Sequence, residues 1–445
     1  MMATMVKAQG VIDVHSHIIT PEFVSALDKE GRLLDEGFPL PKWDAEEQLK
    51  WMDEAGIQTS VLTLAAPQPT SAKVVRATNE AAAKLKREHP DRFMFCASLP
   101  LPDVNAAIEE ARYALDVLGA DGIKLATNAG GQYLGAPELD TLFSFLNERT
   151  AVIILHPHRP EPVNKQVMQQ TPLAMQEYLS ETTRAVSNMI SRNVLARYPN
   201  VKVVVPHCGA YLPLMVPRMK SLTPVMQANK LVGDIDWEAN LAVLYYDLAG
   251  AHSPEVIRML LTITTPDHLL YGSDYPYVAP QVLTQSLQRM QQYLTNEPDL
   301  APYKEMILHK NAEWLLGHSI SMEVCSQGQQ KENKEQGMTI TVNLRYTGTD
   351  GNARKFAEEM SSSETVDAIR AEEGNLRYEY YQSLDDPETI LLIDSWTSQE
   401  AIDKHHATPM MDTIAKLREK YDLHMTVERY TAVETPETEN KFIRK

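Results

Sequence analysis

Short runs of β-branched and aliphatic residues recur along roughly the first 300 residues, and most are followed by a longer segment whose apolar residues have helical spacing. Such runs are typical of strands that are buried on both faces. We expect eight strands, at residues 10–17, 59–64, 92–98, 121–126, 151–155, 201–205, 243–248 and 269–272. Helices are expected at residues 44–52, 73–89, 103–119, 137–149, 281–293 and 303–316, and in a long region that ends at 198. Residues 20–42, interrupted by Gly31, Gly37, Pro39 and Pro41, predict a long loop. This alternation predicts the α/β fold class, with a (β/α)8 TIM barrel formed by residues 1–318.

The composition then changes, which indicates a second domain. Residues 319–337 are rich in Ser, Gln, Glu, Lys and Gly and predict a linker. Beyond it we expect strands at 338–346, 375–383, 389–396 and 423–430, with helices at 352–370, 398–406 and 410–420. This β-α-β-β-α-β order predicts a smaller ferredoxin-like α+β domain at 338–432, followed by a tail at 433–445.

Histidines and one aspartate follow the predicted barrel strands at the point where each strand ends. His15 and His17 close the first strand, His156 follows the fifth, His207 the sixth and Asp274 the eighth. The carboxyl ends of barrel strands meet at one face, where active sites lie, and imidazole is the commonest metal ligand in proteins. The pattern therefore predicts a metal site. His158 could compete with His156, which we favour because it stands first beyond the apolar run.

Charge and cysteine content narrow the classes of partner. The formal net charge of −18 argues against binding to nucleic acid or to an anionic membrane, but not against a small anionic substrate in a locally positive pocket. Three cysteines at no framework spacing fit a reducing compartment. No segment has the length and apolarity of a membrane span or a signal peptide, so a cytoplasmic protein is expected.

Several motifs occur in the order seen in a known family. The His-x-His start, WMDEAGI at 51, LHP at 155, PHCG at 206, YGSDYP at 271 and KNAEWLLG at 310 resemble the decarboxylase branch of the amidohydrolase superfamily, named for aminocarboxymuconate-semialdehyde decarboxylase. The motifs LPLPDV at 99, GADGIKLATNAGGQYLG at 119, ETTRAVSNMI at 181 and HCGAYLPLMVPRM at 207 are most similar to its 6-methylsalicylate decarboxylase-like group. The segment IDSWTSQEAIDKHHATPMM at 393 resembles an antibiotic-biosynthesis-monooxygenase domain, which is usually a dimer.

The first resemblance implies one divalent metal ion, zinc or manganese. Its implied ligands are His15, His17, His156 and Asp274. It also implies that His207 is an acid–base or polarising residue. For decarboxylation we favour Asp274 as the proton donor to the substrate carbon, and the family's hydrolytic variant, in which His207 activates a metal-bound water, stays open. Arg218 stands where the family holds a substrate carboxylate, sometimes in a neighbouring subunit's site, and a surface arginine is the alternative.

Other residues keep two interpretations. Arg184 and His158 are further candidates for substrate binding. Lys124 could be a carboxylated bridging lysine, as in binuclear members of the superfamily, or only a strand-end residue. For Cys208 we favour core packing, on the opposite side from His207 by strand alternation. His405 and His406 could line an aromatic pocket, although a solvated helix face is the simpler expectation.

The expected function is metal-dependent, non-oxidative decarboxylation of a small hydroxylated aromatic or related unsaturated acid. One alternative is a hydrolase or hydratase that acts on an amide, lactone or unsaturated acid with the same residues. Another is that the C-terminal domain acts as a monooxygenase or dimerisation module and the barrel is secondary. A homodimer or larger homo-oligomer is predicted.

Overall fold

The computed structural model describes residues 10–69, 71–164, 166, 171–250, 252–317, 340–383, 386–406, 408 and 410–431. The predicted linker and tail lie outside these residues. The chain divides into two compact units, one within residues 1–325 and the other within 326–445. The predicted domain borders fall in segments that are not described, and they stay predictions.

The first unit is a near-closed barrel of parallel strands in the order β1-β2-β3-β4-β7-β8-β9-β10. These strands are β1 (Val11–Ile18), β2 (Ile57–Leu64), β3 (Phe93–Ser98), β4 (Gly122–Ala126), β7 (Val152–His156), β8 (Lys202–Val205), β9 (Leu244–Asp247) and β10 (Leu269–Leu270). A two-stranded hairpin of β5 (Asn128–Ala129) and β6 (Gln132–Tyr133) follows β4. The predicted TIM-like α/β fold is confirmed.

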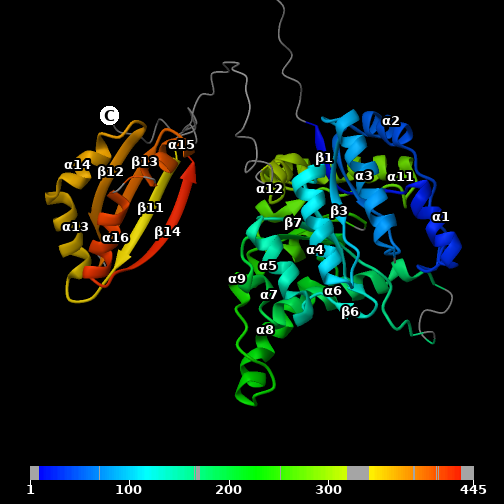
Figure 1. Ribbon diagram of the computed structural model, residues 1–445, viewed down its shortest axis with the longest axis horizontal. Coiled ribbons are helices and arrows are strands. Elements are labelled where there is room, and N and C mark those ends of the chain that lie inside the picture. Colours follow the sequence, from blue (N-terminus) through cyan, green and yellow to red (C-terminus); the bar gives the residue numbers. More distant parts are fainter. Residues whose placement is uncertain are drawn as a thin grey trace, which may run out of the picture. The chain divides into compact units, whose positions relative to one another are not determined.

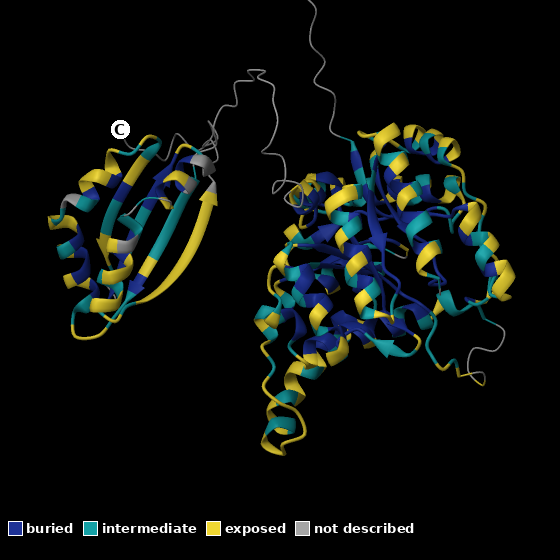
Figure 2. Ribbon diagram, in the orientation of Figure 1, coloured by how far each residue is buried: buried dark blue, intermediate teal, exposed yellow. Residues whose placement is uncertain are grey.

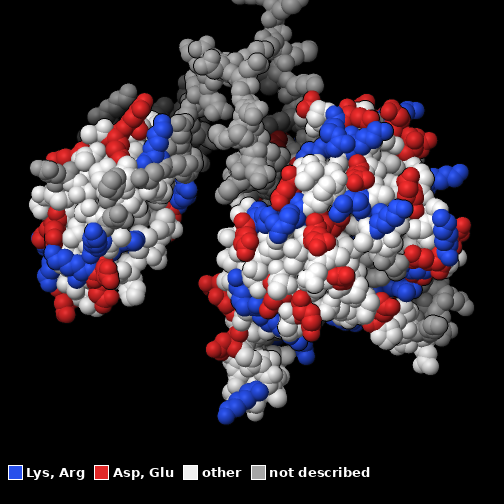
Figure 3. Space-filling view, in the orientation of Figure 1, with Lys and Arg blue, Asp and Glu red and all other residues white. Residues whose placement is uncertain are grey.

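Helices surround the barrel, as Figure 1 shows for α2 to α5 beside β1, β3 and β7. They are α1 (Pro21–Glu30), α2 (Ala45–Ala55), α3 (Ala72–Glu88), α4 (Val104–Tyr113), α5 (Asp140–Glu148), α6 (Glu177–Ser191), α7 (Val194–Arg197), α8 (Leu212–Ala228), α9 (Trp237–Leu241), α10 (Pro254–Leu260), α11 (Pro280–Asn296) and α12 (Asn311–Gly317). No helix in the described ranges is both long enough and apolar enough to cross a membrane. Lys and Arg are interspersed with Asp and Glu on the barrel face seen in Figure 3.

The prediction of a loop at 20–42 is wrong for its first half, which forms α1. Thr20 caps this helix by accepting a hydrogen bond from the Phe23 amide, and Pro21 occupies its first turn. Phe23 and Leu27, four residues apart, are buried on one face of the helix. The cap and the four-residue spacing are visible in the sequence, but the neighbouring glycines and prolines obscured them.

Barrel closure brings the first strand against the segment that follows the last one. The amides of Val14 and His17 donate to the carbonyls of Tyr271 and Tyr275, at 3.0 and 2.8 Å. The Asp274 amide donates to the carbonyl of His15 at 2.8 Å. Gly272 permits this approach, since a Cβ there would lie 2.8 Å from the Cβ of His15. The closure therefore places Asp274 beside the His-x-His pair.

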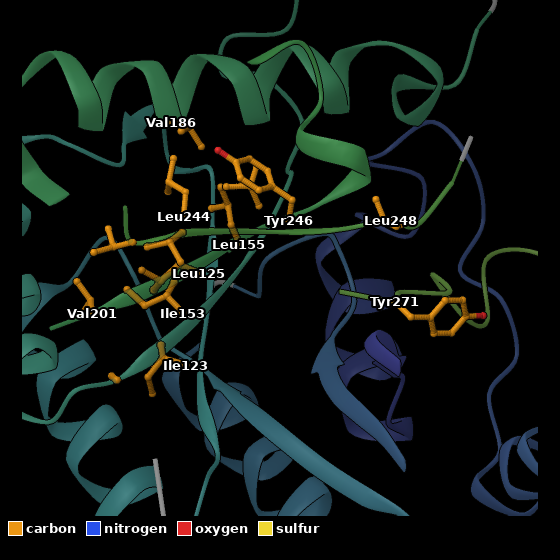
Figure 4. Packing of buried hydrophobic residues seen from close by; sticks show 14 of the residues in the cluster. Ile123, Leu125, Ile153, Leu155, Val186, Val201, Leu244, Tyr246, Leu248 and Tyr271 are labelled. Atoms are coloured by element: carbon orange, nitrogen blue, oxygen red, sulfur yellow. The ribbon is translucent and has the colours of Figure 1, made fainter. Parts of the chain in front are cut away.

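The strands are buried on both faces, as their composition predicts. Val152, Ile154 and Val204 belong to a core inside the barrel, whereas Ile153 and Val203 pack outward against the helices. Figure 4 shows part of the outer core, in which side chains of β4, β7 and β9 meet those of α6. Figure 2 shows buried strands inside a shell of partly exposed helices.

The second unit is an antiparallel sheet in the order β12-β13-β11-β14, which is the ferredoxin-like order expected. Its elements are β11 (Ile340–Thr347), α13 (Asn352–Ser362), α14 (Glu364–Arg370), β12 (Asn375–Gln382), β13 (Thr389–Trp396), α15 (Gln399–His406), α16 (Met410–Lys420) and β14 (His424–Thr431). The single helix expected at 352–370 is two helices, because Ser363 is extended, at φ −90° and ψ 154°. His405, expected on a solvated face, is buried and 2.6 Å from a Glu372 oxygen.

Candidate metal centre

Four side chains at the carboxyl ends of barrel strands converge on one point. His15 and His17 come from β1, His156 ends β7, and Asp274 follows β10. One ligand atom of each lies within 4.8 Å of those of the other three. The three histidines are buried, and the Asp274 side chain is 23% exposed. These are the four residues that the family resemblance implied as ligands, brought together by strands far apart in the chain.

A break in the strand register orients the His-x-His pair. Asp13 of β1 pairs with Ser60 of β2, and Ser16 pairs with Leu62. Between these two pairs β1 advances by three residues and β2 by two, so β1 contains one extra residue, as in a β-bulge. The buried Asp13 carboxylate spans this break, because its Oδ1 accepts from the amides of His15 and Ser273, at 3.1 and 2.9 Å. The bulge and this carboxylate thus fix β1 to the segment that carries Asp274.

Hydrogen bonds select one tautomer for all three histidines. Nδ1 of His15 lies 2.9 Å from Oδ2 of the buried Asp247, and Nδ1 of His156 lies 2.8 Å from the carbonyl of Pro157. Nδ1 of His17 lies 3.0 Å from Oγ1 of Thr63, whose own proton goes to the carbonyl of Ser16. Each Nδ1 is therefore the protonated nitrogen, and each Nε2 keeps its lone pair for a ligand.

The resulting donor set fits a cation. Nε2 of His15 and of His17 lie 3.3 and 3.1 Å from Oδ1 of Asp274, so two ring nitrogens converge on one carboxylate oxygen. Nε2 of His15 is buried and makes no hydrogen bond. A metal ion among these atoms would take the place of a proton between the ring nitrogens and the carboxylate, and three imidazoles with a carboxylate suit a divalent transition metal.

The electrostatics of the cluster agree with this fit. Burial lowers the pKa of His17 to about 4, with His15 and Lys124 acting in the same direction, and burial also holds the pKa of His156 well below its usual range. Both imidazoles are therefore neutral, as metal ligands must be. Burial opposes the charge of His15, but Asp247 and Asp274 outweigh it and raise its pKa well above normal. The two carboxylates thus attract positive charge to this ring.

His207 stands beside the cluster without completing it. Its Nε2 is 3.8 Å from Oδ2 of Asp274, the carboxylate oxygen that faces away from His15 and His17. Its backbone is left-handed, at φ 56°, and its amide donates to Oδ1 of Asp247 at 3.0 Å. Asp247 therefore holds both a candidate ligand and the loop that carries His207.

A cavity of about 720 Å³ opens onto this group. Its polar edge is formed by His156, His207 and Asp274. Four aromatic side chains also line it, and most of the remaining lining side chains are apolar. The four aromatic residues are Phe38, Tyr178, Tyr211 and Tyr277. No lysine or arginine of the described ranges lines the cavity. The arrangement suits a flat, mainly apolar ligand with one polar end directed at the candidate metal centre.

Residues 12–318 match the model of the amidohydrolase family. The chain belongs to this family. Residues 339–417 match the antibiotic biosynthesis monooxygenase family. The decarboxylase yanB of Aspergillus niger is 34% identical over 299 residues, 63% of this chain and 81% of the relative. A 6-methylsalicylic acid decarboxylase of Penicillium expansum is 31% identical over 276 residues, 60% of this chain and 84% of the relative.

The barrel fold also recurs in solved structures. A dihydroxybenzoic acid decarboxylase of Polaromonas sp., solved with manganese and the inhibitor 2-nitroresorcinol, has a TM-score of 0.59 to this amidohydrolase. The match covers 71% of this chain and all of that one, at 17% identity. At such low identity the likeness shows the fold alone.

The other nominated residues lie outside the ligand group. His158 is buried, and its Nδ1 lies 2.8 Å from Oε1 of Glu36. It is not part of the group of four candidate ligands, so it does not compete with His156 there. Arg184 and Arg218 do not line the cavity. Arg184 pairs with Glu181 and donates to the Tyr133 hydroxyl at 3.2 Å, whereas Arg218 is exposed on α8. Their roles in substrate binding stay predictions.

Lys124 and Cys208 are both buried in the barrel. The Lys124 ammonium is buried and donates to Oε1 of Gln68 at 3.0 Å, and burial lowers its pKa to about 8. Cys208 is in the core, as expected, but it also lines the cavity. The argument from strand alternation fails there, because β8 ends at Val205 and Cys208 is left-handed, at φ 56°.

Sequence reasoning missed several buried polar residues around the candidate ligands. Asp247 ends β9, where an aspartate after Leu-Tyr-Tyr could have been read as another polar strand end. Thr63, inside β2, gave no signal, since threonine is common in strands. Glu36 lies in the predicted loop, yet it is buried and accepts from the Tyr178 hydroxyl at 3.0 Å.

Proposed function

We propose that this amidohydrolase is a metal-dependent, non-oxidative decarboxylase of a small aromatic acid with a hydroxyl group next to its carboxylate. The main support for this proposal is that four candidate ligands converge at the polar edge of an otherwise largely apolar cavity, namely His15, His17, His156 and Asp274. The curated relatives described above are decarboxylases, which favours this reaction over a hydrolase or hydratase. The conversion releases carbon dioxide and needs one proton on the ring carbon.

The proposed cofactor is one divalent metal ion, manganese or zinc, held by Nε2 of the three histidines and Oδ1 of Asp274. A relative of the same fold holds manganese. When bound, the ion would polarise the carboxylate and hydroxyl oxygens of the substrate and stabilise their negative charge. The hydrogen bonds from the Nδ1 atoms to Asp247, Thr63 and the Pro157 carbonyl fix the three rings in the orientation that this binding needs.

The cavity orients the substrate by its chemistry. Because the described lining contains no lysine or arginine, an anionic carboxylate is best placed at the candidate metal centre. Tyr277 packs edge-on against His17 and Phe38, with ring centroids 5.3 and 5.6 Å apart, which builds an aromatic wall beside the polar edge. The substrate ring then lies against aromatic and apolar side chains. The inhibitor of the manganese-bound relative, 2-nitroresorcinol, is likewise a flat ring with adjacent polar groups.

Asp274 and His207 are the proposed acid–base pair. Oδ2 of Asp274 faces His207 rather than the other histidines, so it can carry a proton to the ring carbon that bears the carboxylate. Protonation forms a carbon–hydrogen bond and interrupts the aromatic system. The bond to the carboxylate then breaks, carbon dioxide leaves, and the electron pair restores the ring. His207 returns a proton from solvent to Asp274.

The test is to load the purified full chain with manganese or zinc and to follow carbon dioxide release from a panel of hydroxybenzoates. Substrates with an ortho hydroxyl should react, and their para isomers should not. In heavy water, one deuterium should appear at the former carboxyl carbon. Hydrolysis of an amide or lactone panel without any carbon dioxide release from the benzoates would overturn the proposal.

A further inference from the structure

The cavity is larger than a small hydroxybenzoate needs. 6-Methylsalicylate has eleven heavy atoms, which would fill roughly 330 Å³ even if each took the ~30 Å³ that a water molecule occupies in the liquid. The cavity measures about 720 Å³. More than half of it therefore remains beyond a ring bound at the polar edge.

The space that remains has few polar groups to offer. The Tyr178 hydroxyl donates to Glu36 at 3.0 Å, and the Tyr277 hydroxyl donates to the Ala66 carbonyl at 3.1 Å. These two phenol groups are thus committed to the protein and present mainly ring surface to the cavity. Tyr211, 37% exposed at the start of α8, is the third phenol among the described lining residues. Apart from the Tyr211 hydroxyl, the described lining of this space offers additional hydroxyl or carboxylate groups on a substrate few partners to replace their hydration.

Apolar side chains from three helical segments line the part of the cavity away from the strand ends. They are Met175 and Leu179 near the start of α6, Pro213 and Leu214 of α8, and Val256 and Met259 of α10. Met175 is 72% exposed and Leu214 is 63% exposed. When an apolar group covers large apolar side chains that are this exposed, apolar surface is removed from water and the free energy falls.

We infer that the preferred substrate is a 2-hydroxybenzoate with an apolar substituent larger than methyl, an alkyl chain of several carbons, held by this lining. The inference rests on the proposed function and extends it from reaction to substrate class. Leu214 and Met259 then determine specificity, because they contact the chain and not the reacting atoms. Burial of each methylene should raise kcat/KM about 3- to 4-fold until the chain leaves the cavity.

The experiment compares two series of 2-hydroxybenzoates on the metal-loaded full chain, with methyl, propyl or pentyl at carbon 4 or at carbon 6. In at least one series, kcat/KM should rise tenfold or more from methyl to pentyl, through a fall in KM with little change in kcat. The double variant Leu214→Gln with Met259→Gln should reduce this ratio at least fivefold. Leu222→Gln is the matched control, since Leu222 is an exposed leucine of α8 outside the cavity.

The possible failures are distinguishable. If both series are decarboxylated but kcat/KM is flat or falls with chain length, the inference is wrong and the proposed function stands. If light scattering shows that Leu214→Gln dissociates an oligomer while the series stays flat, the exposed lining is a subunit interface and the inference is overturned. If no member is decarboxylated, the proposed function fails. In that case the affinity of the protein for each member of the series is measured by calorimetry. Affinities that do not rise with the length of the alkyl chain would refute the inference.

Discussion

Replacement of Asp247 by asparagine tests the claim that tautomer selection governs metal binding. Oδ2 of Asp247 accepts the Nδ1 proton of His15 at 2.9 Å, and its Oδ1 accepts from the amides of His207 and Ala249, each at 3.0 Å. In Asp247→Asn, one amide oxygen can still accept from the two backbone amides. The amide nitrogen then faces Nδ1 of His15 as a donor, which drives the ring proton to Nε2.

The loss of metal affinity can be estimated from the hydrogen bond between His15 and residue 247, in which donor and acceptor exchange roles. With its proton on Nε2, His15 presents no lone pair to a metal unless the new hydrogen bond from the introduced side-chain amide is broken. Loss of such a supporting partner typically weakens metal affinity 10- to 100-fold, roughly 1.4 to 2.8 kcal/mol. Because Asp247 is fully buried, solvent does not offset the change. We expect the dissociation constant to rise by that factor and the folded state to persist.

The assay is competition for manganese or zinc against a chromogenic chelator, with unfolding followed by circular dichroism. Asp121→Asn is the matched control. Asp121 is also a buried barrel aspartate, but it binds Lys86 and the Phe95 amide and is not part of the ligand group. The control should lose stability and keep its metal affinity. If Asp247→Asn binds metal as tightly as the unmodified chain, tautomer selection by Asp247 is refuted.

Three further predictions concern the ligands, the acid–base residue and the second unit. His15→Ala and Asp274→Ala should lose both metal and decarboxylation by elemental analysis and assay, yet keep the circular dichroism of the barrel, whose core does not depend on the site. Metal retained at one equivalent in both variants would contradict the ligand assignment. His207→Asn, which suits the left-handed backbone there, should keep the metal and lower kcat by about 10²-fold. An emptied site would instead identify His207 as a ligand. Truncation after Ser319 should reduce the oligomeric state seen by light scattering if the second unit supplies an association surface, and an unchanged state and rate would refute that role.

The fold and the five strand-end candidates could be predicted because both follow from local patterns, and the family resemblance then singled out four of the five as candidate ligands. Apolar runs with strand composition mark each barrel strand, and the first polar residue beyond a run marks the strand end, as His156 does after Leu155. The barrel topology then brings these ends together, although nothing between His17 and Asp274 in the chain indicates contact. The order of elements in the second unit could likewise be predicted, since it follows from the alternating apolar patterns of its strands.

The parts that could not be predicted depend on contacts between distant elements. No sequence pattern indicates that β1 contains a bulge or that Asp13 spans it, because a bulge arises from the pairing with β2. The partners of the Nδ1 atoms come from β2, β9 and a backbone carbonyl, and only the tertiary structure assigns them. The misread segment at 20–42 has another origin, since the Thr20 cap and the four-residue spacing of Phe23 and Leu27 are present in the sequence.

The strained backbone at the site indicates that the barrel, and not a bound metal, fixes the positions of the site residues. His207, Cys208 and Asp274 are left-handed, at φ 56°, 56° and 67°, a conformation that costs non-glycine residues about 1 to 3 kcal/mol each. Such strain persists only where surrounding contacts impose it. Here the Asp247 carboxylate binds the amide of His207, and the carbonyl of His15 binds the amide of Asp274 at 2.8 Å. These contacts come from buried strands, so the side chains that face the cavity are positioned before any metal or substrate binds.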